Sequence, residues 1–221
     1  MNINSNLSTF IKKHKKKENQ ILFHKVPCKN NKVIENLINN FLIKKNSFIF
    51  ESVEKRKIRG RYTIIGANPD KIWEFEKNKI FLKQDGKKKL LKGSPYVFLK
   101  NIIEKFNFPL PKNLPPISSL LVGYFSYDII RYIEKIPNNC INDLKIPDVR
   151  LMRPKTIIIH DNNLKNIFFI NNCFSDQKIK DYKNYYSNII NEIKTMKYLA
   201  FQSNLNKNII KKKINKIKVK S

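Results

Sequence analysis

The chain has 221 residues, enough to bury a hydrophobic core as one large domain or as one domain with extensions. Its 45 lysine and arginine residues against 17 acidic residues give a formal net charge of +28, which suggests nucleic acid or an acidic surface as partner. The lysines are spread along the whole chain, however, and no zinc-finger, KH or RNP signature accompanies them, so the sequence predicts no specific nucleic-acid binding.

Cysteine usage and hydropathy favour a cytoplasmic protein. The three cysteines, Cys28, Cys140 and Cys173, are far apart, and they form neither a disulfide framework nor a CxxC metal motif. No apolar run reaches the roughly 18 residues that a membrane span needs, and the amino terminus lacks the apolar segment of a signal peptide. We therefore expect no membrane partner.

The first elements expected are a helix, a strand and a second helix. Residues 1–19 are polar and basic, but three apolar residues at helical spacing behind Ser5 or Ser8 predict a short amphipathic helix, with a frayed tail as the alternative: Leu7, Phe10 and Ile11. Residues 20–28 predict a strand that ends at Pro27. Residues 32–43 place four apolar residues on one helix face: Val33, Leu37, Ile38 and Phe41.

The most informative stretch follows, at residues 47–70. An apolar run at 48–50 is typical of a strand buried on both faces, and it ends on the polar pair Glu51 and Ser52. After a basic connection, residues 61–65 predict a second strand, closed by Gly66 and a turn at 68–70. The simplest interpretation is two strands joined by a charged loop.

The polar end of the first strand has two interpretations. An amino acid ligand would need an acceptor for its ammonium group and donors, such as an arginine, for its carboxylate. Glu51 and Ser52 supply the first requirement and Arg61 could supply the second. The alternative is an ordinary strand end beside a solvated basic loop.

Residues 71–91 predict short strands in hairpins. The runs I-W-E-F-E and K-I-F-L-K flank a turn at 76–78, and Asp85-Gly86 is a second hairpin signal. Trp73 and Phe75 alternate with Glu74 and Glu76, a pattern that predicts one solvent-exposed face.

A helix and a linker are expected next. Ser94-Pro95 begins a helix whose predicted apolar side has five residues: Val97, Leu99, Ile102, Ile103 and Phe106. Residues 107–117 contain four prolines and predict an irregular linker across the surface.

The remainder predicts three strands and two helices. A buried strand at 120–124 leads into a helix near Asp128, where Asp128 and Arg131 form either a catalytic pair or, more commonly for such spacing, a surface pair. The block Met152-Arg153-Pro154 leads into a core strand at 156–160, which pairs with residues 164–171 across a turn. Residues 175–199 predict the clearest helix, with apolar positions at Ile179, Tyr182, Tyr186, Ile189, Ile190 and Ile193.

Three blocks of this sequence resemble one enzyme family in the same order. F-I-F-E-S-V-E followed by R-G-R-Y-T-I-I-G-A-N-P-D resembles the L-L-E-S and G-R-Y-S-x-I-G-x-x-P motifs in the amino-terminal domain of anthranilate synthase component I. G-Y-F-S-Y-D-I-I-R resembles its G-Y-x-x-Y-D-x-x-R block, and P-D-V-R-L-M-R-P resembles its P-D-x-x-L-M-R-P strand. The resemblance covers about residues 20–200.

The pattern and the resemblance together imply an architecture. Many strands, hairpin turns and the lack of a βαβ rhythm predict an α+β fold with a largely antiparallel sheet and packed helices. We expect a helix or tail at 1–19, the amino-terminal regulatory domain at 20–200, and at 201–221 either a basic tail or the truncated start of the chorismate-binding domain, which Ser203-Asn204 resembles.

The resemblance also implies a function. Family members are lyases of tryptophan biosynthesis that convert chorismate and glutamine-derived ammonia to anthranilate and pyruvate with Mg²⁺, together with a glutamine amidotransferase subunit, component II. L-Tryptophan is their feedback inhibitor, and matching motifs assign its binding to Ser52, Glu51 and, less directly, Arg61.

The chemistry of the enzyme is expected elsewhere. The 17 acidic residues are scattered, with no cluster suited to Mg²⁺ and no assignable catalytic residue. We therefore expect a regulatory half that binds no cofactor, is inactive alone and needs a chorismate-binding catalytic domain or fragment; a truncated gene, a split gene and a fragment all fit.

Two alternatives stay open at this point. The amino-terminal domain of aminodeoxychorismate synthase component I shares the architecture, and a product assay on a reconstituted enzyme separates the two. A basic nucleic-acid-binding module is the alternative of another class, and nucleic-acid binding that survives physiological salt would support it.

Overall fold

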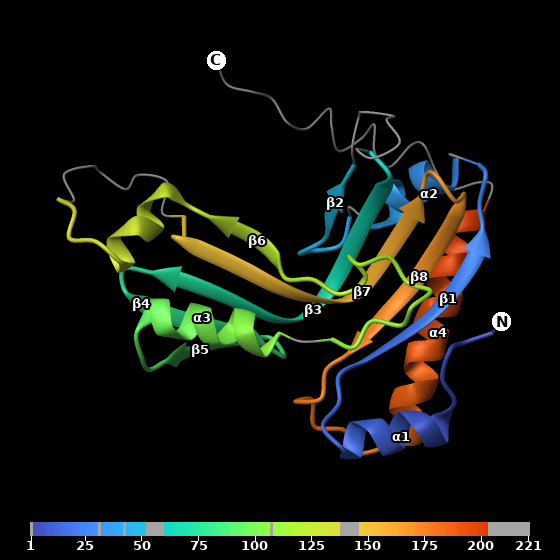
Figure 1. Cartoon of the computed structure of the whole chain (residues 1–221), viewed down its shortest axis with the longest axis horizontal. Helices are drawn as coiled ribbons and strands as arrows, with labels where there is room; N and C mark the ends of the chain where they lie inside the picture. Colours follow the sequence, from blue (N-terminus) through green and yellow to red (C-terminus); the bar gives the residue numbers. More distant parts are fainter. Residues whose placement is uncertain are drawn as a thin grey trace.

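Two long strands, β3 (Tyr62–Glu76) and β7 (Val149–Asp161), run antiparallel through the centre of an eight-stranded sheet (Figure 1). The computed structural model describes residues 2–30, 32–41, 43–51, 60–106, 108–137 and 146–202. Every strand pairing in this part of the chain is antiparallel. The predicted α+β fold with a largely antiparallel sheet and packed helices is therefore confirmed.

The other strands divide the sheet into two halves. In the β1 half, β1 (Gln20–Pro27) pairs with β8 (Asn166–Cys173), β8 with residues 156–161 of β7, and β2 (Phe48–Phe50) with residues 64–66 of β3. In the β5 half, β5 (Lys87–Leu91) pairs with β4 (Lys79–Gln84), β4 with residues 72–76 of β3, and β6 (Val122–Phe125) with residues 149–152 of β7.

Strand β3 passes without interruption through the predicted turn at 68–70, so that prediction is wrong. Asn68 has a positive φ of 53°, and the register against β7 shifts between Pro69 and Lys71. This is a β-bulge, which accommodates an extra residue and bends the strand while the pairing with β7 continues on both sides. The bulge marks the boundary between the two halves.

Two strands predicted to be buried lie at edges of the sheet. Phe50 of β2 is 50% exposed, because β2 pairs only with β3 among the described strands. In β6 only Val122 is buried, and Tyr124 and Phe125 are exposed. Gly123 brings β6 against β7 so closely that a Cβ atom there would overlap the carbonyl oxygen of Arg150.

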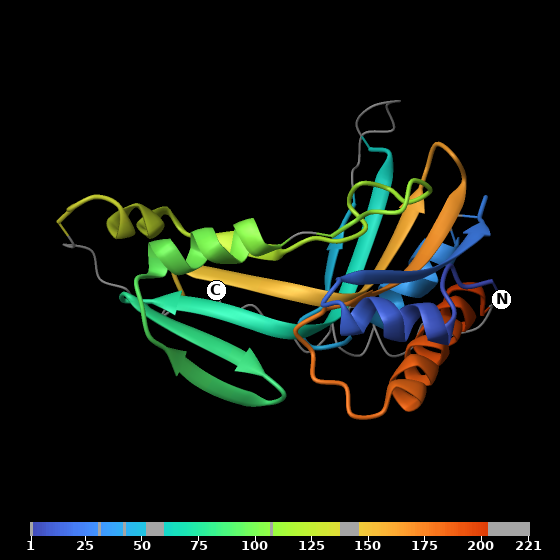
Figure 2. The same ribbon diagram turned by 60° about the horizontal axis from the view of Figure 1, so that its bottom comes forward.

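Three helices cover one face of the β1 half (Figures 1 and 2): α1 (Leu7–Lys15), α2 (Lys32–Phe41) and α4 (Tyr182–Phe201). The predicted amphipathic helix near the amino terminus is confirmed, with Asn6 rather than Ser5 or Ser8 as its cap. Helix α4 begins seven residues later than predicted, because Asp181 caps it by accepting a hydrogen bond from the backbone of Asn184.

The proline-rich segment covers the opposite face of the β1 half. Its described residues, 108–117, form no helix or strand, as predicted, and they pack on the sheet. Leu114 is buried there against Ile157, Ile159 and Phe168, with Phe108 and Ile117 partly buried beside it.

In the β5 half, α3 (Pro95–Lys105) and the 3₁₀ helix η1 (Tyr127–Tyr132) pack on the face that bears Trp73 and Phe75. Val97 and Ile103 of α3 are exposed, contrary to the predicted apolar side. The prediction of a wet face at Glu74 is also wrong: Glu74 is 6% exposed because Lys83 pairs with it at 2.7 Å. In the described part of the chain, no helix is long and apolar enough to cross a membrane.

Candidate functional site

The predicted ligand residues lie at one end of the β2–β3 pair. Phe50 faces Ile64 across the two strands, so Glu51, directly after β2, and Arg61, directly before β3, leave the sheet at the same end. The side chain of Glu51 is exposed. Ser52 lies outside the described residues, so the structure brings together two of the three predicted residues at the level of the strand ends.

Arg61 is held by a carboxylate that sequence analysis did not single out. Its Nη2 atom donates to Asp161 Oδ2 at 2.8 Å, and its Nε atom lies 3.2 Å from both oxygens of Asp161. Arg61 is partly exposed, whereas Asp161 is 1% exposed at the end of β7. This geometry leaves the Nη1 edge of the guanidinium as the part of Arg61 best suited to meet a ligand.

The surroundings of Asp161 stabilise its ionised form. Burial by itself would raise the pKa of Asp161, but hydrogen bonds from Arg61 and from the backbone N–H groups of Leu164 and Asn163 outweigh it, so the pKa lies below its ordinary value. The carboxylate therefore stays charged and paired with Arg61 at neutral pH.

The turn after β7 also fixes the backbone at Arg61. The backbone N–H of Asn162 donates to the carbonyl oxygen of Arg61 at 2.8 Å, and its side-chain amide donates to the carbonyl oxygen of Gly60 at 3.2 Å. The point at which the chain re-enters the sheet is thus clamped to the turn between β7 and β8.

Aromatic side chains flank this end of the sheet. Phe48 and Phe50 point to the same face of β2, with ring centroids 5.2 Å apart. Phe48 lies over Gly66, where a Cβ atom would overlap its ring, so the glycine makes room for the aromatic side chain. Phe50, directly before Glu51, is 50% exposed and leaves an uncovered aromatic ring at this end of β2.

The second predicted pair, Asp128 and Arg131, is structural. Arg131 donates to Asp128 at 2.9 Å and to the carbonyl oxygen of Ile136 at 3.0 Å, which secures the segment after η1. Nearby, Tyr132 donates to Asp148 at 2.6 Å. Burial, reinforced by Asp148, raises the pKa of Tyr132, so its hydroxyl remains a donor. The ion pair expected from the spacing of Asp128 and Arg131 is therefore present, with Asp128 exposed and Arg131 partly exposed.

Sequence analysis missed an ion network at the boundary between the halves. Arg153 is 9% exposed and donates to Asp70 through Nε at 2.8 Å and to Asp176 through Nη2 at 2.9 Å. Its guanidinium lies 3.8 Å from the ring centroid of Phe174. No sequence spacing links these residues, because they come from three separate segments.

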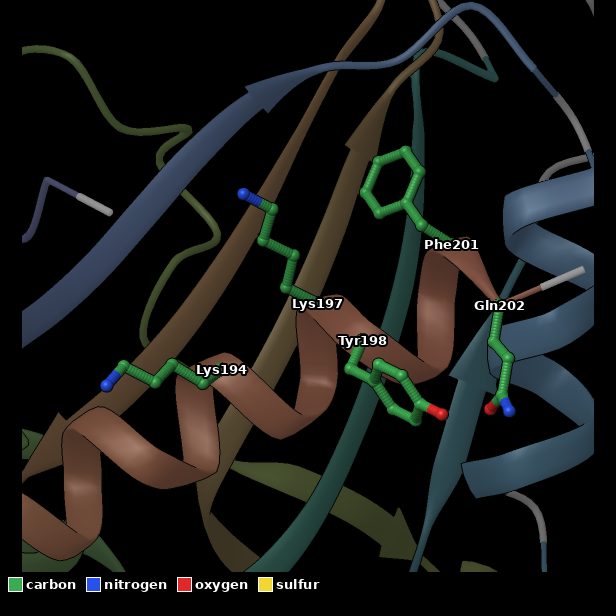
Figure 3. Close-up of a pocket in the computed structure, with 5 residues that line it drawn as sticks. All are labelled: Lys194, Lys197, Tyr198, Phe201 and Gln202. Carbon is green, nitrogen blue, oxygen red and sulfur yellow. The ribbon is translucent and has the colours of Figure 1, made fainter.

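A hollow of about 420 Å³ lies at the carboxyl-terminal end of α4 (Figure 3). Its described lining consists of Lys194, Lys197, Tyr198, Phe201 and Gln202. Lys197 Nζ is 3.4 Å from Nε2 of His24 in β1. Among the described lining residues there is no carboxylate, and the two lysines make this side of the hollow positively charged.

The described residues offer no binding site for a metal ion. They contain no group of three or more histidine, cysteine, aspartate or glutamate side chains that could hold a metal ion. These residues therefore do not fit the Mg²⁺ ion that the resemblance implies for the whole enzyme.

Curated relatives match about two thirds of the chain. The proteins from Acetivibrio thermocellus and Cereibacter sphaeroides, both anthranilate synthase component 1, are 33% and 30% identical over 150 and 149 residues, or 67% and 65% of this chain. The chain is similar to anthranilate synthase component I. The resemblance seen in its motifs is thereby confirmed.

The match covers less than a third of the length of each relative. It spans 30% of the Acetivibrio and Cereibacter enzymes, and the anthranilate synthase component 1 of Thermus thermophilus is 29% identical over 56% of this chain and 26% of its own length. The solved structure of anthranilate synthase component I from Streptococcus pneumoniae covers 66% of this chain and 31% of its own, with 19% identity and a TM-score of 0.46. No protein-family model matches the chain.

Proposed function

We propose that this chain is the amino-terminal regulatory and structural part of an anthranilate synthase component I, the enzyme that forms anthranilate in tryptophan biosynthesis. The observation that carries the proposal is the 33% identity to anthranilate synthase component 1 over 150 residues. The order of the three family motifs supports it, as does the common position of Glu51 and Arg61 at one end of the sheet.

In this proposal the end of the β2–β3 pair holds part of the site for L-tryptophan as feedback inhibitor. The Ser52 hydroxyl accepts a hydrogen bond from the ammonium group, Glu51 sets the local negative charge, and the Nη1 edge of Arg61 meets the carboxylate. Asp161 keeps Arg61 charged and oriented. The exposed ring of Phe50 offers an apolar contact for the indole.

The reaction itself is assigned to another part of the enzyme. Mg²⁺ would neutralise the carboxylates of chorismate, and the described residues hold no cluster suited to it. We therefore assign chorismate, Mg²⁺ and the catalytic groups to a chorismate-binding domain, and ammonia supply to a glutamine amidotransferase subunit. A soluble, cytoplasmic enzyme is part of the same proposal.

The feedback site is tested by Ser52→Ala in an enzyme reconstituted with a chorismate-binding domain. We expect weaker inhibition by tryptophan, by about 0.5–1.5 kcal/mol for one lost hydrogen bond, with uninhibited turnover nearly unchanged. The measurement is a tryptophan inhibition curve of anthranilate formation. Detection of aminodeoxychorismate instead of anthranilate would identify the enzyme as an aminodeoxychorismate synthase.

Ser47→Ala is the matched control. Ser47 lies just before β2, at its other end, and its hydroxyl donates to the carbonyl oxygen of Lys44 at 2.7 Å. Its replacement should leave the inhibition curve in place. Equal tryptophan sensitivity of the wild type and Ser52→Ala would remove Ser52 from the site.

A further inference from the structure

Two lysine-rich segments that are far apart in the sequence lie side by side at the end of the sheet where β1 begins and β8 ends (Figure 1). The first is residues 12–17, at the end of α1; the second is residues 178–183, which lead into α4. Tyr182 and His14 join them through a hydrogen bond of 3.0 Å, and Asn19 accepts from the backbone N–H of Ser175 at 2.9 Å. We call the two segments the basic patch.

The positive charge of the basic patch is not neutralised by its surroundings. It carries eight lysines, all exposed: Lys12, Lys13, Lys15, Lys16, Lys17, Lys178, Lys180 and Lys183. None of them forms an ion pair with a carboxylate within the described ranges. Among the acidic residues near the patch, Asp181 caps α4 and Asp176 is bound by Lys71 and Arg153. Glu18 is then the remaining nearby carboxylate that could offset the charge of the eight lysines.

Structural roles explain only part of this charge. Lysines in the last turn of α1 interact favourably with the helix dipole, but that effect does not extend to Lys178, Lys180 or Lys183, which lie before or at the start of α4. In the β4–β5 hairpin, Lys83 pairs with Glu74 and Lys88 lies 4.0 Å from the ring centroid of Phe81, whereas Lys87 and Lys89 are exposed like the lysines of the basic patch.

The chemistry of the basic patch selects one kind of partner. Of the apolar residues of α1, Phe10 is buried and Ile11 packs against the core, which leaves a partly exposed Leu7 and no continuous apolar face for insertion into a bilayer. The patch contains no arginine for bidentate base recognition, and its one aromatic residue, Tyr182, is held by His14. Lysine ammonium groups are point charges that suit phosphate oxygens.

We propose that the basic patch binds nucleic acid through the phosphate backbone, without sequence preference. The proposal is independent of the tryptophan site and of the family assignment. It also agrees with the absence of a sequence-specific nucleic-acid motif, because backbone contacts position a strand but read no bases.

The test compares two charge-reversed variants of the full chain. The patch variant replaces three lysines of the basic patch: Lys12→Glu/Lys16→Glu/Lys183→Glu. The β5 variant replaces three exposed lysines in or next to β5 and changes the net charge of the protein by the same amount: Lys87→Glu/Lys89→Glu/Lys92→Glu. The probe is a labelled single-stranded RNA of about 20 nucleotides and mixed sequence, followed by fluorescence anisotropy over a range of KCl concentrations. Thermal unfolding checks that both variants fold. If one of them does not fold, the variant with glutamine at the same three positions takes its place.

We expect the patch variant to bind about tenfold more weakly near 0.1 M salt, with a salt slope reduced by roughly 2 for three lost contacts. The β5 variant should stay within about twofold of wild type. Equal weakening of both variants would show that net charge alone drives binding, and would overturn the proposal. Two further results would also overturn it. One is that the wild type binds no RNA at physiological salt. The other is that the wild type binds polyglutamate or anionic vesicles as tightly as RNA and that the patch variant loses this binding.

Discussion

Arg153 lies where β3 and β7 pass from one half of the sheet to the other. Burial by itself would lower the pKa of Arg153, but the hydrogen bonds that it donates to Asp70 and Asp176 raise it overall, so the guanidinium stays charged although almost no solvent reaches it. Asp176 is bound in turn by Lys71 at 2.6 Å. A single side chain therefore ties the bulge of β3 to the segment that follows β8.

Replacing Arg153 should destabilise the protein far more than replacing the partly exposed Arg131. Arg153→Met leaves Asp70 and Asp176 without their main partner, and breaking a buried ion pair in this way costs about 3–5 kcal/mol. Arg131→Ala, which removes a pair with Asp128 at the surface, should cost about 0–1 kcal/mol. Urea denaturation of the two variants measures both values, and similar costs would contradict a structural role for the Arg153 network.

At the scale of elements, α1 is joined to α4 by aromatic and histidine contacts. Phe10 is fully buried and contacts the rings of Tyr182, Tyr185 and Tyr186. Burial lowers the pKa of His14 below its ordinary value of 6.5, although the backbone carbonyls of Gln177 and Phe174 oppose that shift. Burial likewise lowers the pKa of His24 in β1.

These histidines predict a loss of stability in mild acid. The unfolded chain takes up protons near pH 6.5 and the folded chain only at lower pH, so the unfolded state binds more protons as the pH falls through 6.5. The free energy of unfolding should therefore decrease from about pH 7.5 to about pH 5.5. His14→Gln should lose less stability over this range, as should His24→Gln, and the double variant least. Urea denaturation at the two pH values measures this, and an identical loss in all four proteins would refute it.

At the scale of the whole molecule, the β5 half has one face without a helix among the described elements. A row of residues crosses its five strands there in register: Tyr124, Arg150, Glu74, Phe81 and Leu90. Tyr124 and Leu90 are exposed at the two ends, and Glu74 forms ion pairs in the middle. Such a mixed surface, apolar at its ends, suits contact with another domain.

We expect the 221 residues alone to form no anthranilate from chorismate, ammonia and Mg²⁺, and to co-purify with a co-expressed chorismate-binding domain. Tyr124→Asp should abolish that co-purification by placing a charge on the contact surface. Tyr198→Asp, at an exposed tyrosine on α4, is the matched control and should retain it. Turnover by the pure chain would contradict the first expectation, and independent elution of two folded proteins would contradict the second.

Local patterns were sufficient where neighbouring residues decide the structure. The hairpin turn at Asp85-Gly86 was predictable because both residues adopt the positive φ angles that such a turn needs. The pairing of β7 with β8 and the helical periodicity of α4 were likewise readable, and so were the motifs around Glu51 and Ser52. The turn predicted at 68–70 failed because Asn68-Pro69 also fits a β-bulge, and only the pairing with β7 decides between the two.

The sequence by itself determined the fold class, the position of most strands and helices, and the resemblance to anthranilate synthase component I. Only the tertiary structure decided which strands lie at edges, that Glu74 is buried, and that Arg61 and Arg153 are bound by Asp161, Asp70 and Asp176. The reason is physical: periodicity and turn propensity act between residues close in sequence, whereas burial and ion pairing depend on which distant segments the sheet brings together.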